Sequence, residues 1–145
     1  MRLSDLPFPV YGDLSYRGKC PTEAQEMVTF FAMLRREYPG TWGALAVHPR
    51  NEGLKSGGQF ASVQRHAAEG MTKGAADIII PGAPALVLEM KRRDHTQSAW
   101  QDGQVEYLAA AHEAGAFACV ALGHESAWEA VRAWIGGQAH NSTRS

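Results

Sequence analysis

The chain has 145 residues, 45% of them hydrophobic and 20% charged, and its formal net charge at pH 7 is −1. These values predict one globular domain with a sizeable core, and they exclude a protein that binds nucleic acid through a strongly basic composition. The two cysteines are far apart, and no stretch approaches the ~18 apolar residues that a membrane span requires, so we expect a soluble, cytoplasmic protein without a disulfide framework.

The first predicted element is an irregular arm over residues 1–20, which contain prolines and glycines but no clear periodicity. A helix is expected from Thr22, because Thr22 and Gln25 form a capping-box pattern, and Pro39 ends it. The apolar stripe of this helix is formed by Met27, Phe30, Phe31, Leu34 and Tyr38. Residues 42–48, with the sequence WGALAVH, are predicted to form the first strand of a sheet.

The middle of the chain is rich in glycine and contains a hairpin signal. Residues 49–59 are predicted to form a loop, and residues 60–69 a short helix. Two apolar runs follow, Ile78–Ile80 and Ala85–Leu88, and the PGAP sequence between them is a turn signal. Together they predict an antiparallel hairpin centred on Ala83.

The charged residues of this hairpin are Asp77, Glu89 and Lys91. In the predicted register Asp77 lies opposite Glu89, with Cβ atoms roughly 4.5–5.5 Å apart, and Lys91 shares the face of Glu89. Two carboxylates that face each other repel, and a cation between them would relieve that repulsion. Their hard oxygen atoms on a half-open site suit Mg²⁺ or Mn²⁺ better than zinc. The alternative is that all three residues are solvated charges at the strand ends.

A second helix is predicted from Ser98, whose first residues repeat the capping-box pattern, to Gly115. Gln104 falls on its buried stripe together with Trp100. A buried amide must find a hydrogen-bond partner, which is either nearby backbone or the charged site. Residues 116–122 are predicted to form a buried strand. A last amphipathic helix follows, with these residues facing inward: Trp128, Val131, Trp134 and Ile135.

The order of these elements predicts an α/β fold, in which a mixed central sheet is flanked by helices. We expect residues 21–136 to form the domain and residues 137–145 a flexible, polar tail, because no repeat or linker divides the chain.

Basic residues are concentrated around the hairpin. Between residues 50 and 93, once the two proposed metal ligands are set aside, the only acidic residues are Glu52 and Glu69. Such a local excess of positive charge is what binding to a phosphate backbone needs, although each residue alone is also explained as a solvated surface charge. The expected DNA contacts are Lys73, Arg65, Arg50, Lys55 and Arg92. Lys73, in the turn before Asp77, is the first candidate for a phosphate contact.

Asp77 followed by Glu89-Met90-Lys91 matches the D…(D/E)-x-K motif of the PD-(D/E)xK nuclease superfamily. The surrounding residues resemble the VRR-NUC family, the virus-type replication-repair nucleases. These residues are Asn51-Glu52-Gly53, the segment Gly70 to Asp77, Gln104 and Gly115. The resemblance covers about Glu23 to Trp134. One position departs from the family pattern, because Ala76 stands where proline is common.

The resemblance implies a restriction-endonuclease-like fold with an αβββαβ core. It also implies a metal-dependent endonuclease that hydrolyses DNA phosphodiester bonds with Mg²⁺ or Mn²⁺. Relatives of this size often act as homodimers on branched or junction DNA, including Holliday junctions. The resemblance leaves open a virus-encoded, phage-type protein that acts in the host cytoplasm.

The resemblance also assigns roles to the site residues. Asp77 and Glu89 would hold the metal, joined by the backbone carbonyl of Met90 and by a carboxylate of the first helix. That carboxylate would be Glu23, with Glu26 as the alternative; an acidic residue in a first helical turn is also explained by the helix dipole alone.

The remaining catalytic assignments are Lys91 and Gln104. Lys91 would orient the attacking water or stabilise the charge that develops on the phosphate, and Gln104 would support the site from the second helix. Two other functions stay open from the sequence: a non-catalytic nucleic-acid-binding or assembly module with the same fold, and a metal-dependent hydrolase of small phosphoesters. Against the first alternative, every catalytic position of the motif is filled.

Overall fold

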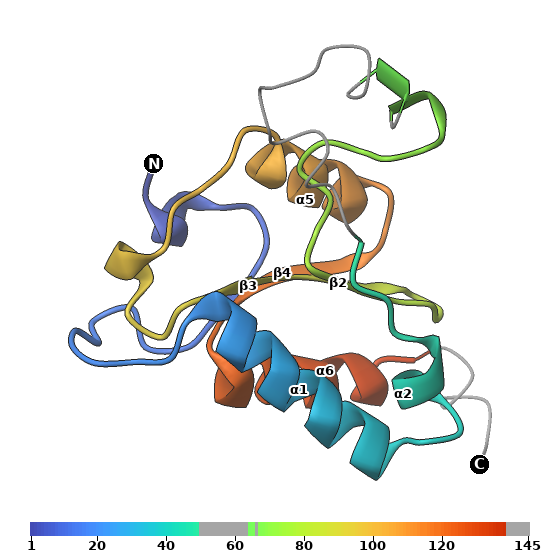
Figure 1. Ribbon diagram of the computed structural model, residues 1–145, viewed down its shortest axis with the longest axis horizontal. Helices are drawn as coiled ribbons and strands as arrows, with labels where there is room; N and C mark the ends of the chain where they lie inside the picture. Colours follow the sequence, from blue (N-terminus) through green and yellow to red (C-terminus); the bar gives the residue numbers. More distant parts are fainter. Residues whose placement is uncertain (50–63, 66, 139–145) are drawn as a thin grey trace.

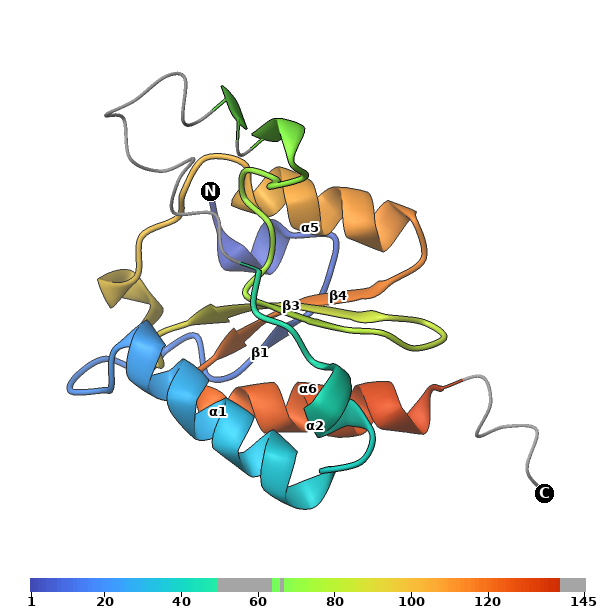
Figure 2. The same ribbon diagram turned by 45° about the vertical axis from the view of Figure 1, so that its right-hand side comes forward.

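The computed structural model describes residues 1–49, 64–65 and 67–138 of the chain. Its elements are η1 (Leu3–Asp5), β1 (Val10–Tyr11), α1 (Glu23–Glu37), α2 (Trp42–Leu45), β2 (Ile78–Ile80), β3 (Leu86–Lys91), η2 (His95–Gln97), α5 (Gln104–Glu113), β4 (Phe117–Leu122) and α6 (His124–Gly136). The strands form a four-stranded sheet in the order β1-β4-β3-β2, in which β2 is antiparallel to β3 and the other neighbours are parallel. Helices α1 and α6 lie against one face and α5 against the other (Figure 1, Figure 2). The predicted mixed sheet between helices is confirmed.

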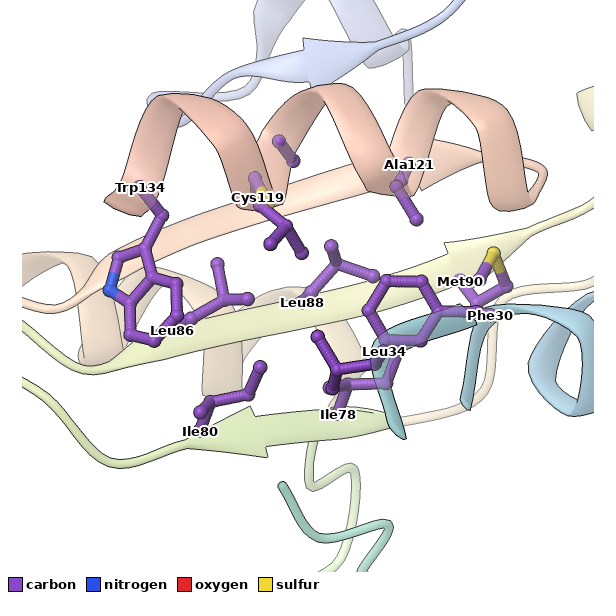
Figure 3. Packing of buried hydrophobic residues seen from close by; sticks show 13 residues of the cluster. Phe30, Leu34, Ile78, Ile80, Leu86, Leu88, Met90, Cys119, Ala121 and Trp134 are labelled. Carbon is purple, nitrogen blue, oxygen red and sulfur yellow. The ribbon is translucent and has the colours of Figure 1, made fainter. Parts of the chain in front are cut away.

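Strand β3 is buried along its whole length, because it has a neighbouring strand on each side and helices on both faces. Leu88 and Met90 point toward α1 and α6, in the larger core cluster (Figure 3). Val87 points toward α5, in the smaller cluster. By the same alternation Glu89 and Lys91 face α5, so the fold encloses these charges within its second layer.

The hairpin has the predicted register. Ile79 pairs with Val87, which centres the turn on Ala83. Continued by two residues, this register sets Asp77 opposite Glu89. The turn sequence and the alternation of side chains were therefore enough to align the two strands.

Residues 42–48 do not form the predicted strand. Trp42–Leu45 form the short helix α2, and Val47 then makes an isolated antiparallel bridge to β2. The Gly43 N–H donates to the Tyr38 carbonyl at 2.8 Å, and a Cβ on Gly43 would lie 2.7 Å from that oxygen. The chain therefore turns tightly against the end of α1 before it extends, and the first strand of the αβββαβ core is reduced to the bridge beside β2.

The helix predicted from Ser98 begins only at Gln104. The Ser98 hydroxyl accepts from the Arg92 N–H at 2.8 Å, which holds Ser98 against the end of β3. Gly103, with a φ of 90°, stands at the N-cap position instead. A tertiary hydrogen bond has displaced the capping box that the sequence indicated.

The two ends of the domain also differ from the prediction. Val10–Tyr11 form β1, an edge strand parallel to β4, and Phe8 is buried, so the arm is not irregular throughout. Gln138 was predicted to lie in the flexible tail over 137–145, yet it is buried and accepts from the Ala83 N–H at 2.9 Å. The hairpin turn thus holds the chain beyond α6.

Several predicted segments lie outside the described residues. These are residues 139–145 of the tail, residues 50–59 of the loop, and residues 60–63 and 66 of the short helix; residues 64, 65, 67 and 68 of that helix are helical. Within the described part of the chain, no helix has the length and apolar character needed to cross a membrane.

Candidate active site

Strands β2 and β3 carry the charged residues of the motif on the face that α5 covers. Asp77 directly precedes β2 and is half-buried, whereas Glu89 and Lys91 lie within β3 and are each 1% exposed. The sequence predicted a half-open site, so the burial of Glu89 and Lys91 is the main difference from expectation. The burial follows from the cover that Gln104 of α5 and the preceding residues Ala99 and Trp100 place over this face of β3.

Gln104, the first residue of α5, joins the two buried charges. Its Nε2 donates to Glu89 Oε2 at 3.0 Å, and its Oε1 accepts from Lys91 Nζ at 3.1 Å. Lys91 Nζ also lies 3.6 Å from Glu89 Oε2. A carboxylate only accepts and an ammonium only donates, so the amide of Gln104 is held in this one orientation. The fold therefore brings these three predicted site residues together.

Asp77 contacts β3 through its side chain. Its Oδ2 accepts from the Met90 N–H at 2.9 Å. The N–H and the carbonyl of an extended residue point to the same side, so the Met90 carbonyl also faces the Asp77 edge of β3. The backbone carbonyl of Asp77 lies 2.6 Å from His48 Nδ1. The sequence did not predict this contact, because nothing in the chain near His48 indicates which segment it meets.

The charge of Glu89 is strongly disfavoured in the folded protein. Burial raises the pKa of its carboxyl well above the ordinary value of 4.5, and the negative charge of Asp77 raises it further. The Lys91 ammonium opposes this shift, while the charge of Glu23 adds to it. The Lys91 ammonium alone therefore does not compensate the charge of ionised Glu89, and a bound cation would stabilise this ionised form.

One oxygen of the site has no hydrogen-bond partner. Within the described residues, Glu89 Oε1 is buried without a donor, whereas Oε2 has both Gln104 and Lys91. Also within those residues, no group of three or more His, Cys, Asp or Glu side chains could hold a metal ion. Mg²⁺ does not require such a cage, because it usually keeps several waters and takes one or two carboxylates together with substrate phosphates. Asp77 and the free oxygen of Glu89 fit that mode of binding.

The two candidate carboxylates of α1 have different surroundings. Glu26 is 4% exposed, accepts from the His124 N–H at 3.1 Å, and lies 2.8 Å from His124 Nδ1. It therefore caps the N-terminus of α6, and these contacts occupy both of its carboxylate oxygens. Glu23 is half-buried at the start of α1, and its charge reaches Glu89.

The predicted DNA contacts before β2 are exposed where the structure describes them. Lys73 Nζ lies 3.8 Å from the Asp102 carboxylate, and Arg65 Nε lies 4.0 Å from that of Glu69. Such exposed pairs are weak, so both cations remain available to a phosphate. Two of the predicted contacts lie outside the described residues: Arg50 and Lys55.

Arg92 has a structural role that the sequence did not predict. Its Nη2 donates to the Cys20 carbonyl at 2.8 Å, and its Nε donates to the Pro21 carbonyl at 3.0 Å. These contacts tie the chain before Glu23 to the end of β3. They occupy guanidinium donors that a DNA contact would use, which weakens the assignment of Arg92 as a DNA-binding residue.

Two further contacts of Lys91 were missed by sequence reasoning. The Ala99 carbonyl oxygen lies 2.8 Å from Lys91 Nζ, and the centre of the Trp100 ring lies 4.3 Å from it. Trp100 was predicted only as a buried position of a helix. The late start of α5 is what brings these two residues to the site.

Comparisons with models of known protein families and with curated proteins find no match to this sequence. Among solved structures, the chain is similar to one described as a "VRR_NUC domain protein", with a TM-score of 0.63 and 19% sequence identity. The similarity covers 83% of this chain and 92% of the other. The protein therefore has a VRR-NUC-like fold, the restriction-endonuclease-like α/β fold that the motif of Asp77, Glu89 and Lys91 predicted.

Proposed function

We propose that the protein is a metal-dependent deoxyribonuclease that hydrolyses phosphodiester bonds in DNA. The observation that carries this proposal is the buried oxygen of Glu89 that lacks a donor among the described residues, next to a second carboxylate, Asp77. A buried acceptor oxygen without a donor is costly, so such an arrangement is expected where a ligand completes it. The VRR-NUC-like fold supports the same conclusion.

Asp77 and Glu89 are the residues that would hold Mg²⁺ or Mn²⁺, with the Met90 carbonyl as a further ligand, while Glu23 adds negative charge near them without completing a three-carboxylate group. Their oxygen atoms match the ligand preference of both ions. When bound, the ion would polarise the phosphate and lower the pKa of a nearby water.

Lys91 and Gln104 complete the chemistry with groups of the chain itself. The Lys91 ammonium supplies positive charge where negative charge develops on the phosphate oxygens. It is 1% exposed, and in such a water-poor position a charge acts more strongly than it does at the surface. Gln104 holds the ammonium and the Glu89 carboxylate in a fixed relation through its two hydrogen bonds.

The substrate that we propose is duplex or branched DNA, including four-way junctions, bound by a homodimer. Exposed Lys73, four residues before Asp77, supports a phosphate contact beside the site. Branched DNA and the homodimer rest on the resemblance of the motif. A panel of linear, single-stranded, flap and four-way-junction DNA distinguishes among the substrates.

The test is cleavage of that panel, and of a small phosphodiester, by the purified protein with Mg²⁺ or Mn²⁺. We expect DNA cleavage that is lost with EDTA and in Asp77→Ala, and retained in Glu113→Ala, which removes an exposed carboxylate at the end of α5. Cleavage of the small ester alone would support a phosphoesterase instead. DNA binding without cleavage under all these conditions would overturn the nuclease and favour a binding module.

A further inference from the structure

The segment between η2 and α5, together with the first residue of α5, surrounds the ammonium of Lys91 with three different groups. Lys91 Nζ donates to the Ala99 carbonyl at 2.8 Å and to Gln104 Oε1 at 3.1 Å, and it lies 4.3 Å from the centre of the Trp100 ring. Glu89 lies on the remaining side, at 3.6 Å. The position of the catalytic ammonium is therefore set largely by residues 99–104.

These contacts exist because the segment is not helical. In a helix that began at Ser98, the Ala99 carbonyl would accept from the N–H of Gly103. Since α5 begins at Gln104, that carbonyl faces Lys91 instead. The Gln101 N–H also bonds outside a helix, because it donates to the side-chain oxygen Oε1 of Gln104 at 2.9 Å.

A close approach of two glycines fixes this segment beside the Asp77 strand. A Cβ on Gly74 would lie 2.5 Å from the Gly103 carbonyl oxygen and 2.7 Å from the Gln104 nitrogen, so only glycine fits there. Gly74 has a φ of 78° and Gly103 one of 90°, values that also favour glycine. The backbone that carries Trp100 is thereby held against the turn that precedes Asp77.

The ring of Trp100 packs against the smaller core cluster and also faces the ammonium. Its ring is half-buried, and with Leu3, Leu14 and His95 it lines a hollow of about 360 Å³ beside the arm. Its close polar contact is with Lys91. An aromatic face attracts an ammonium through the ring quadrupole, and this attraction is strongest where the charge is removed from water.

We propose that Trp100 is a positioning residue for Lys91, and that its ring holds the ammonium beside Glu89 in the orientation that cleavage uses. The inference rests on the proposed nuclease function, to which the role of Lys91 belongs. The Lys91 side chain has four methylene groups and many rotamers. Without the ring, the two hydrogen bonds to Ala99 and Gln104 constrain its ammonium from fewer directions.

The first test compares Trp100→Leu, which removes the aromatic face, with Trp100→Phe, which keeps one. On the DNA that the wild type cleaves, in millimolar Mn²⁺, we expect Trp100→Leu to lower kcat by roughly 10- to 100-fold with KM unchanged. Trp100→Phe should retain most of the rate. Trp128→Leu, a matched control on the α6 side of the sheet, should leave kcat unchanged. A wild-type kcat in Trp100→Leu, or equal losses in both Trp100 variants, overturns the proposal.

The second test does not need catalysis. In a double-mutant cycle of thermal unfolding, Trp100→Leu should lower Tm in the wild type by more than in Lys91→Met, and we expect a difference of roughly 2–6 °C. Equal effects in the two backgrounds overturn the contact, whether or not the protein cleaves DNA. If the wild type cleaves no DNA while the coupling persists, the proposed function fails, and Trp100 is left with a stabilising contact and no part in cleavage.

Discussion

At the scale of single residues, the site consists of charges that the fold has removed from water. Glu89 and Lys91 are each 1% exposed, although neither ion gains stability from burial as such. Desolvation of such a pair often costs as much as its attraction returns. Retaining both charges inside β3 is therefore better explained by chemistry than by stability.

Lys91 provides the first prediction. Lys91→Ala and the bulkier Lys91→Met should both lower DNA cleavage by roughly 100- to 1,000-fold, because in the proposed mechanism the ammonium stabilises the charge of the transition state. DNA affinity should change little, since a side chain that is 1% exposed adds little to binding of the phosphate backbone. Single-turnover cleavage and a binding titration measure the two quantities. A wild-type rate in either variant would remove Lys91 from the mechanism.

Glu89 provides a prediction about pH. Its pKa in the folded protein lies above the ordinary value of 4.5. At a pH between 4.5 and this raised pKa, the folded state therefore retains a proton that the unfolded chain has released. The stability of the metal-free protein must then fall as the pH rises through this range. Glu89→Gln removes this loss, so its Tm in EDTA should exceed that of the wild type by an amount that grows as the pH rises above 4.5 and becomes constant above the pKa of the folded protein.

The control for this experiment is Glu129→Gln, an exposed carboxylate of α6. Its Tm should follow that of the wild type at every pH. Parallel curves for Glu89→Gln and the wild type would show that the charge of Glu89 is not disfavoured by folding.

At the scale of elements, the register of the β2–β3 hairpin is held from outside by the end of α6. The Gln138 side chain accepts from the Ala83 N–H at 2.9 Å and donates to the Pro84 carbonyl at 3.0 Å. Trp134 Nε1 donates to the same carbonyl at 2.7 Å. A Cβ on Gly82 would lie 2.6 Å from Gln138 Oε1, so the turn fits closely against this amide.

Gln138→Ala should therefore destabilise the protein by about 1–2 kcal/mol, because a buried amide and its hydrogen bonds to the turn are lost. Thermal or denaturant unfolding measures the effect. Arg132→Ala, on the exposed side of α6, should stay within about 0.5 kcal/mol of the wild type. If both variants unfold like the wild type, the hairpin does not depend on this contact.

At the scale of the whole molecule, the proposed metal site would couple metal binding to the stability of the fold through its two carboxylates. A ligand that binds only the folded state at about 100 times its Kd adds roughly 2.7 kcal/mol. Saturating Mn²⁺ should then raise Tm by roughly 5–15 °C, with a smaller rise for Mg²⁺ if its affinity is lower. The rise should increase with pH, since Glu89 must lose its proton to accept the ion.

Asp77→Asn is the comparison that decides this prediction. The substitution removes the repulsion with Glu89, so Tm without metal should hold or rise, and the shift with Mn²⁺ should shrink. Equal shifts in the variant and the wild type, or no shift in either at millimolar Mn²⁺, would show that these carboxylates do not form a metal site.

The sequence by itself determined what depends on neighbours along the chain. The PGAP turn and the alternation of side chains set the pairing of Ile79 with Val87 and the shared face of Glu89 and Lys91. The capping box of Thr22 and Gln25 is present as predicted. Turn chemistry, strand alternation and capping act over a few residues, so they can be recognised without knowledge of the rest of the fold.

Only the tertiary structure decided which distant groups meet. The Ser98 hydroxyl has the features of a helix cap but bonds to Arg92, and Glu26 has the position of a site carboxylate but caps α6 through His124. The burial of Glu89 depends on the cover from Gln104 of α5, which is formed later in the chain. A local pattern shows that a polar group needs a partner, but the packing of distant segments determines which partner lies within reach.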